Sequence, residues 1–274
     1  MRRTRQVLCA IGLAVSACLP AAAVEPYQFG VFPYLPTTRI HDLYGPMAAD
    51  FAAKMGRQVE LSSKADFQSF REELRSETYD IAFVQPFDYV DAHDKHGYLP
   101  LTRKAHNLDA VIVVRQDSPL KMIKDLEGKT IANPSAEAAV SHLTSMALRD
   151  AGIDPQTGVK RYYGKNHFGC LQSVLIGAAD ACGTVEQVLR TIRKERQLTG
   201  RLRILGHIAQ IPASVFVVHR RVAQKDREAL LKTILEWPTT EEGRKILEGG
   251  RFTPFVAASD ADYAVVRRYI RSTR

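Results

Sequence analysis

Short apolar runs alternate with amphipathic helical segments along most of the chain, and this alternation constrains the fold more than any other feature. The runs 80–84 and 111–115 each contain four consecutive apolar residues, as expected for buried strands. Between such runs lie segments with a period near 3.6 residues, for example the stripe of Leu43, Met47 and Phe51. Strands that alternate with helices predict an α/β protein with mixed, mostly parallel sheets flanked by helices.

The same patterns predict where the individual elements lie. We expect strands at 27–32, 58–61, 80–84, 111–115, 130–132, 161–163, 179–183, 203–205 and 215–218. We expect helices at 39–55, 67–74, from Pro86 onward, from 133–135 to 151, at 168–176, 185–196, 223–236, 239–248 and 260–271.

The chain contains no internal repeat and no linker rich in Pro, Gly or Ser, so any division into lobes must fall between ordinary elements. The best breaks lie near 105–115 and 205–215, where two strands can cross between lobes. We therefore predict a discontinuous first lobe, residues 25–108 plus 210–274, and an inserted second lobe, residues 109–209.

Residues 1–23 have the pattern of a secretory signal peptide. Arg2, Arg3 and Arg5 form a basic start, residues 7–15 form an apolar core too short to span a bilayer, and Ala21–Ala23 supply a small-residue cleavage site. Export to the periplasm follows from this pattern. Without the three arginines, 35 basic residues face 30 acidic ones, a surplus too small and too scattered to predict nucleic-acid binding.

The four cysteines divide between the leader and the mature chain. Val15–Cys18 loosely resembles a lipoprotein cleavage box, so acylation of Cys18 is an alternative to release after Ala23. Cys170 and Cys182 remain in the exported chain, where an oxidising compartment favours a disulfide. Two buried free thiols are the alternative, because pairing depends on whether the two residues face each other.

Motifs that carry catalysis, cofactor binding or metal binding are lacking in the sequence. There is no P-loop, no G-x-S-x-G and no H-E-x-x-H. His93 and His96 share one helix face without further ligands, which favours a solvated helix end over a metal site. His167 and Cys170 lie one helical turn apart, but no third residue orients them as a catalytic pair. We expect neither enzymatic activity, nor a cofactor, nor a bound metal.

Four stretches in collinear order carry a family resemblance. They are 29–34 (FGVFPY), 79–89 (YDIAFVQPFDY), 117–120 with 126–135 (DSPL and LEGKTIANPS), and 167–183, which runs from a histidine through a helix to DACG. Together they resemble the periplasmic binding proteins of the phosphate, phosphite and phosphonate family. The resemblance implies a two-lobed, type II periplasmic-binding-protein fold, an oxyanion ligand and an ABC importer as partner, with the protein acting as a monomer.

The resemblance also implies that the ligand binds in a cleft between the two lobes. The loops 33–38, 85–87, 135–138 and 166–167 precede predicted helices, and helix N-termini present unpaired N–H groups that suit an oxyanion. The candidate ligand-binding residues are Tyr34, Thr37, Thr38, Gln85, Ser135, Ala136, Glu137, His167 and Ser214.

Each polar candidate has an expected role and a plainer alternative. The hydroxyl of Tyr34 and the amide of Gln85 would donate to the ligand. His167 would donate as well, with a charge that responds to mild pH changes. Thr37 and Thr38 would contact the ligand or simply cap the following helix.

The sequence also departs from the family pattern, in which hydroxyl residues follow the Asn-Pro step. Ser135 is followed here by Ala136, Glu137 and Ala138, so either the Glu137 side chain points to solvent or it repels an oxyanion. Ser214 stands where aminophosphonate-binding relatives have an acidic residue. The nature of the ligand therefore stays open, a non-phosphorus solute included, and a ligand sensor that signals to a membrane histidine kinase is the alternative function.

Overall fold

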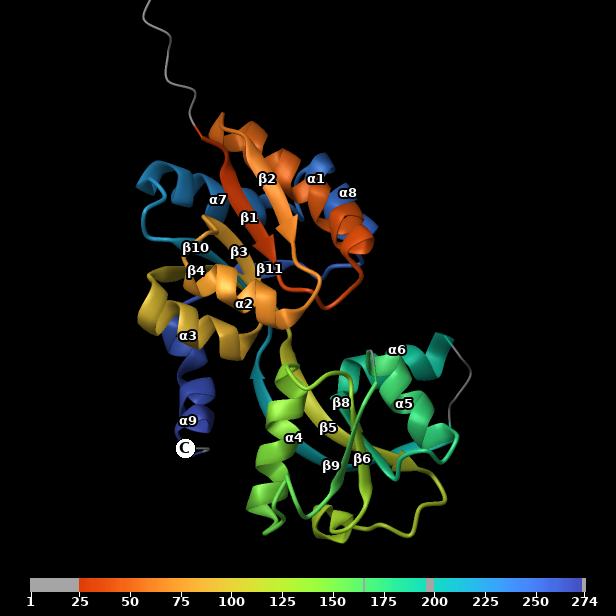
Figure 1. The fold of residues 1–274 in the computed structure, drawn as a ribbon. Helices are drawn as coiled ribbons and strands as arrows, with labels where there is room; N and C mark the ends of the chain where they lie inside the picture. Colours follow the sequence, from red (N-terminus) through yellow and green to blue (C-terminus); the bar gives the residue numbers. More distant parts are fainter. Residues whose placement is uncertain (1–24, 165, 196–199, 273–274) are drawn as a thin grey trace, which may run out of the picture.

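Two β-sheets form the framework of the protein, and helices cover both of them (Figure 1). The structure, a computed structural model, describes residues 25–164, 166–195 and 200–272. The predicted signal peptide, with the alternative acylation site at Cys18, lies outside the described residues. No helix of the described part is long and apolar enough to cross a membrane.

The first sheet is built from both ends of the chain. Its strand order is β11 (Phe255–Ala257), β4 (Tyr98–Lys104), β10 (Val215–His219), β3 (Ile81–Val84), β1 (Tyr27–Val31) and β2 (Val59–Ser63). β1 pairs in parallel with β2 and β3, whereas β10 is antiparallel to both β3 and β4. The helices of this part are α1 (Thr37–Met55), α2 (Phe67–Arg75), α3 (Pro86–His96), α7 (Gln224–Glu236), α8 (Glu241–Gly250) and α9 (Ala264–Ser272), the last preceded by a 3-10 turn at Asp260–Tyr263.

An aromatic core fixes these helices on the first sheet. Phe29, Phe83 and Phe216 pack together on the sheet, and Phe51 of α1 stacks on Trp237 at a ring-centroid distance of 5.7 Å. All five side chains are buried. Because α1 begins directly after the loop that follows β1, this packing also fixes the position of that loop.

The second sheet is formed by the middle of the chain. Its order is β7 (Lys160–Tyr163), β6 (Thr130–Asn133), β8 (Ala181–Val185), β5 (Asn107–Arg115) and β9 (Leu202–Pro212). β6 is parallel to β7 and β8, and β5 is antiparallel to β8 and β9. Its helices are α4 (Ala139–Asp150), α5 (His167–Leu175) and α6 (Glu186–Glu195), with a 3-10 turn at Ile123–Leu126.

The chain passes between the sheets twice. It leaves β4 at Lys104 and enters β5 at Asn107, and it returns from Pro212 of β9 to Val215 of β10. We call the first sheet with its helices lobe 1 and the second sheet with its helices lobe 2. The predicted lobe boundaries fall inside β5 and β9, a few residues from these crossings. β5 and β9 are hydrogen-bonded neighbours, so the two crossings run side by side.

The predicted two-lobed α/β fold is confirmed, with three differences in detail. β4 and β11 were not expected. Pro100 and Lys104 obscure the strand pattern of β4, and β11 has only three residues. Parallel and antiparallel pairs are nearly balanced, whereas mostly parallel sheets were predicted. The helix expected from 133–135 begins only at Ala139, since residues 134–138 form a turn.

A disulfide ties α5 to β8 inside lobe 2. The sequence left open whether Cys170 and Cys182 pair, and the structure joins them, with their Cα atoms 5.7 Å apart. Both residues are fully buried in one of the two apolar clusters of this lobe. A sulfur held in a disulfide offers no thiolate, so the pairing removes the nucleophile on which a His167–Cys170 reaction would depend.

Candidate functional site

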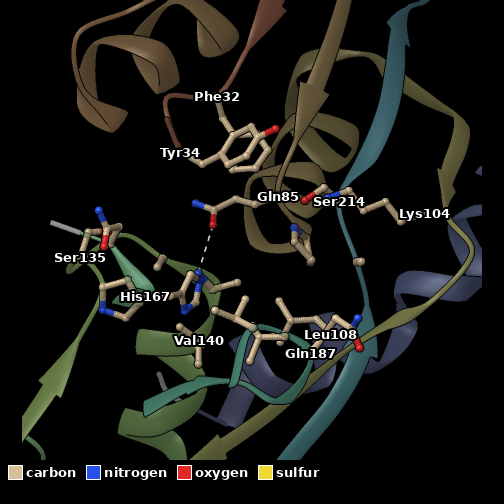
Figure 2. A pocket seen from close by; sticks show the side chains of 18 of the residues that line it. Phe32, Tyr34, Gln85, Lys104, Leu108, Ser135, Val140, His167, Gln187 and Ser214 are labelled. Atoms are coloured by element: carbon tan, nitrogen blue, oxygen red, sulfur yellow. Dashed lines mark hydrogen bonds between the residues drawn. The ribbon is translucent and has the colours of Figure 1, made fainter. Parts of the chain in front are cut away.

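A cavity of about 380 Å³ lies between the two lobes, within the size range of small-molecule sites. Side chains from lobe 1, from lobe 2 and from both crossing segments line it (Figure 2). Five of the nine predicted ligand-binding residues line this one cavity: Tyr34, Gln85, Ser135, His167 and Ser214.

The lobe 1 wall of the cavity is aromatic. Phe32, Tyr34 and Phe67 line it, and the rings of Phe32 and Tyr34 lie 4.8 Å apart. The Tyr34 hydroxyl is hydrogen-bonded at 2.9 Å to the hydroxyl of buried Tyr44, and either oxygen can be the donor. Burial raises the pKa of Tyr34, so the phenol stays neutral. Tyr34 therefore presents its ring to the cavity.

Gln85 spans the cavity and joins the two lobes. It follows β3 and begins α3, and its side chain is only 4% exposed. Its Nε2 donates to the Glu137 carbonyl at 2.9 Å. Its Oε1 accepts from the Ala139 N–H at 3.1 Å, the bond dashed in Figure 2. Ala139 is the first residue of α4. The amide thus satisfies an N–H that the helix leaves unpaired.

The turn before α4 contributes less to the cavity than predicted. Ser135 and Ala138 line the cavity, whereas Ala136 and Glu137 are not among its lining residues. The Glu137 backbone carbonyl accepts from Gln85 and, at 3.3 Å, from Arg71. The contact of Glu137 with the other lobe is thus made by its backbone, and its carboxylate neither lines the cavity nor faces a ligand there.

His167 heads α5 and lies at the cavity as a neutral ring. Asn166 caps this helix by accepting the Gly169 N–H at 2.9 Å. A 2.9 Å hydrogen bond joins His167 Nδ1 to the Thr184 hydroxyl. Burial lowers the pKa of His167 to about 4. The predicted response of its charge to mild pH changes is therefore corrected, because the ring is uncharged throughout the neutral range.

Thr37 and Thr38 do not line the cavity. Both are exposed at the start of α1, where Pro36 occupies the N-cap position. Neither threonine acts as the cap that the sequence suggested.

The crossing segments supply the predicted Ser214 and several residues that the sequence analysis missed. Lys104, His106, Asn107 and Leu108 line the cavity from the first crossing, and Ser214 lines it from the second. The Lys104 N–H donates to the Ser214 carbonyl at 3.2 Å, which holds the two crossings together. Only the position of these residues in the sequence could have indicated that they line the cavity, since Lys104 directly precedes the predicted crossing between lobes.

Gln187 and Val188, at the start of α6, complete the lobe 2 wall together with Val140 and Val185. The neighbouring Glu186 is not a lining residue and instead faces Arg190 and His207. Among the described residues that line the cavity there is no Asp or Glu, and Lys104 is the one Lys or Arg. Such a cavity favours an anionic or neutral guest over a cation.

One group of residues has the spacing of metal ligands, and it lies away from the cavity. His93, Asp94 and Asp260 are the only such group in the described part of the chain. The Arg267 guanidinium donates to both carboxylates, at 2.6 Å each. An arginine already neutralises this group, so it is an ion-pair cluster that ties α9 to α3.

Comparison with known proteins places the chain in a family. Residues 29–263 match the family described as ABC transporter, phosphonate, periplasmic substrate-binding protein. PhnD1 of Prochlorococcus marinus, in complex with methylphosphonate, has a TM-score of 0.77 at 16% identity, over 90% of this chain and 97% of that one. A binding protein component of an ABC phosphonate transporter from Pseudomonas aeruginosa has a TM-score of 0.73 at 16% identity, over 90% and 86%.

More distant structures have the same fold. The aliphatic sulphonate binding protein SsuA of Escherichia coli has a TM-score of 0.59 at 15% identity, over 91% of both chains. Nothing in these matches supports the histidine-kinase alternative. Because the family match covers most of the chain and the predicted resemblance is confirmed, the chain belongs to the periplasmic phosphonate substrate-binding proteins of ABC transporters.

Proposed function

We propose that this protein captures a small oxyanion, a phosphonate, phosphite, phosphate or related species, in the cavity between its lobes and delivers it to an ABC importer. The observation that carries the proposal is a cavity lined from both lobes, whose described lining residues include no carboxylate and one lysine, Lys104. Membership of the family supports the role in transport. The protein would work as a monomer in the periplasm, with a membrane permease as its partner.

Contacts across the cleft explain how ligand binding and closure are coupled. Gln85 and Arg71 of lobe 1 donate to the Glu137 carbonyl of lobe 2, and Phe87 packs on His142 at a ring-centroid distance of 5.1 Å. A ligand that contacts both lobes stabilises this closed arrangement through its higher affinity for it. The permease would then recognise the closed form.

A binding screen tests the proposal. The protein, exported by an expression host and purified from its periplasm, is mixed with phosphate, phosphite, alkylphosphonates, alkylsulfonates and neutral solutes of similar size. A ligand at 100 times its Kd raises the free energy of unfolding by about 2.7 kcal/mol, which a thermal-shift assay detects easily. Stabilisation by at least one oxyanion and by none of the neutral solutes is expected. Folded protein that responds to no anion would contradict the proposal.

A further inference from the structure

The cavity has two polar ends with Gln85 between them. Ser135 and His167 lie at one end, and Lys104 and Ser214 lie at the other (Figure 2). Among the described lining residues the two ends differ in charge, because His167 is neutral and only Lys104 has an ammonium group. The position of an anionic group in the cavity therefore depends on which end offers it free donors.

The end at α4 offers an anion few donors. The Ala139 N–H already donates to Gln85 Oε1, and the hydroxyl residues that usually follow the Asn-Pro step are replaced by Ala136, Glu137 and Ala138. An anion at this helix terminus would have to displace the Gln85 side chain. That would also free the Gln85 Nε2, which now donates to the Glu137 carbonyl. In the turn before α4, Ser135 is the one hydroxyl residue that lines the cavity.

The Lys104 end offers a positive charge that no carboxylate of the described residues neutralises. No carboxylate forms an ion pair with Lys104 within the described residues, and its Nζ lies 5.7 Å from the ring centre of Phe83. Burial lowers the pKa of Lys104, because the ammonium group loses hydration there. No opposite charge among the described residues offsets that loss. His106 beside it is hydrogen-bonded to Thr253, and its pKa is lowered by burial and then by the Lys104 charge. An anion at this end would pair with one ammonium and with neutral donors.

Apolar walls flank the space between the two ends. Phe32, Tyr34 and Phe67 face it from lobe 1, and Leu108, Val140 and Val188 face it from lobe 2. A volume of about 380 Å³ is far larger than the ~30 Å³ share of one water molecule, so a single phosphate or phosphite ion would leave much of it unfilled. The walls also offer no carboxylate that would bind an amino group.

We propose that the cavity is built for an organic anion that carries one negative head group at Lys104 and an uncharged apolar substituent between the aromatic and aliphatic walls. Alkylphosphonates in their singly charged form and alkylsulfonates have this chemistry. Inorganic phosphate, phosphite and aminoalkylphosphonates do not. This inference rests on the proposed function and narrows its ligand class.

Titration calorimetry with the purified protein tests it. The ligands are phosphate, phosphite, methylphosphonate, butylphosphonate, butanesulfonate and 2-aminoethylphosphonate. Each CH₂ group that moves from water to the apolar walls should strengthen binding about fourfold, so butylphosphonate should bind at least about tenfold more tightly than methylphosphonate. Phosphate, phosphite and 2-aminoethylphosphonate should bind more weakly than either. The sulfonate shows whether the head group must contain phosphorus.

Lys104→Met tests the head-group position, because methionine keeps the length of the side chain and removes its charge. We expect binding of butylphosphonate and butanesulfonate to weaken by about 10- to 100-fold, the usual range for losing a hydrogen bond to a charged group. Lys104→Arg keeps the charge and should keep most of the affinity. Lys121→Met, which removes an exposed lysine of lobe 2, is the matched control and should bind like the unaltered protein. Circular dichroism establishes that each variant is folded.

Three results would overturn the inference, and they are distinguishable. Phosphate or phosphite binding as tightly as butylphosphonate would exclude the role of the apolar walls. Unchanged affinity in Lys104→Met would exclude Lys104 as the partner of the head group, while the proposed capture of an oxyanion would stand. Failure of every anion to bind the folded, unaltered protein would contradict the proposed function and the inference with it.

Discussion

His167 shows how burial sets the chemistry of a single side chain in the cleft. An ordinary histidine has a pKa near 6.5, whereas burial lowers the pKa of His167 to about 4. Between these values the unfolded chain binds a proton that the folded protein does not. The free energy of unfolding therefore falls as the pH falls through this window.

Replacement of His167 by Gln should make the protein less sensitive to acid. The pKa difference corresponds to about 3 kcal/mol of stability lost by the unaltered protein between pH 7.5 and pH 4. The variant should not lose this stability as the pH falls. It lacks the hydrogen bond between His167 and Thr184, so it should be less stable than the unaltered protein at pH 7.5. Urea denaturation across this pH range measures the difference, with His41→Gln, at an exposed histidine, as the control. Parallel stability curves for His167→Gln and the unaltered protein would contradict the prediction.

Single residues also show what a sequence can and cannot reveal about a site. The loop positions of Tyr34, Gln85, Ser135, His167 and Ser214 could be predicted, because their neighbourhood follows from the order of strands and helices. The direction of each polar atom could not, since it depends on partners far along the chain. Tyr34, for example, turns its hydroxyl to Tyr44, and Gln85 pairs with backbone groups more than 50 residues away.

At the scale of elements, the start of α4 is held by a residue of the opposite lobe. Gln85→Ala would remove two hydrogen bonds across the cleft, each worth roughly 1 kcal/mol. The closed form should lose stability relative to the open form, so organic anions should bind about 5- to 30-fold more weakly by calorimetry. Gln68→Ala, at an exposed residue of α2, serves as the control. Unchanged affinity would mean that these bonds do not contribute to closure.

The disulfide between α5 and β8 should stabilise lobe 2. The two cysteines that it joins are 12 residues apart in the sequence. The chain-entropy model then assigns it about 3 kcal/mol. Cys170→Ala/Cys182→Ala should lower the free energy of unfolding by about this amount, measured by urea denaturation. The unaltered protein should show a similar loss after reduction, whereas the double variant should not respond to reductant. Equal stability of the two proteins without reductant would contradict the prediction.

Elements differ in how well their sequence identifies them. The hydrophobic stripes of α1 and of the buried strands could be predicted because periodicity reports burial on one face. The start of α4 was placed too early, since the Asn-Pro step resembles a helix start although the chain makes a turn first. β11 has three residues, two of them exposed, which leaves too little pattern to recognise.

At the scale of the whole molecule, we expect the two crossings to act as the hinge. Both run side by side at one edge of the cavity, and the bonds from Gln85 and Arg71 to Glu137 close the cleft elsewhere. Saturating ligand should therefore reduce the radius of gyration measured by small-angle X-ray scattering. The reduction should be larger for Gln85→Ala, whose free form opens further. A radius that does not change while calorimetry reports binding would mean that the lobes do not move.

The position of β10 in the first sheet also bears on the order in which the chain can fold. β10 lies between β3 and β4, yet it follows the whole of lobe 2 in the sequence. All strands of lobe 2 come from one continuous stretch, so this lobe can form as soon as that stretch is available. The first sheet, in contrast, lacks an inner strand until Val215–His219 have been made. A growing chain thus cannot complete the first sheet before the whole of lobe 2 has been synthesised.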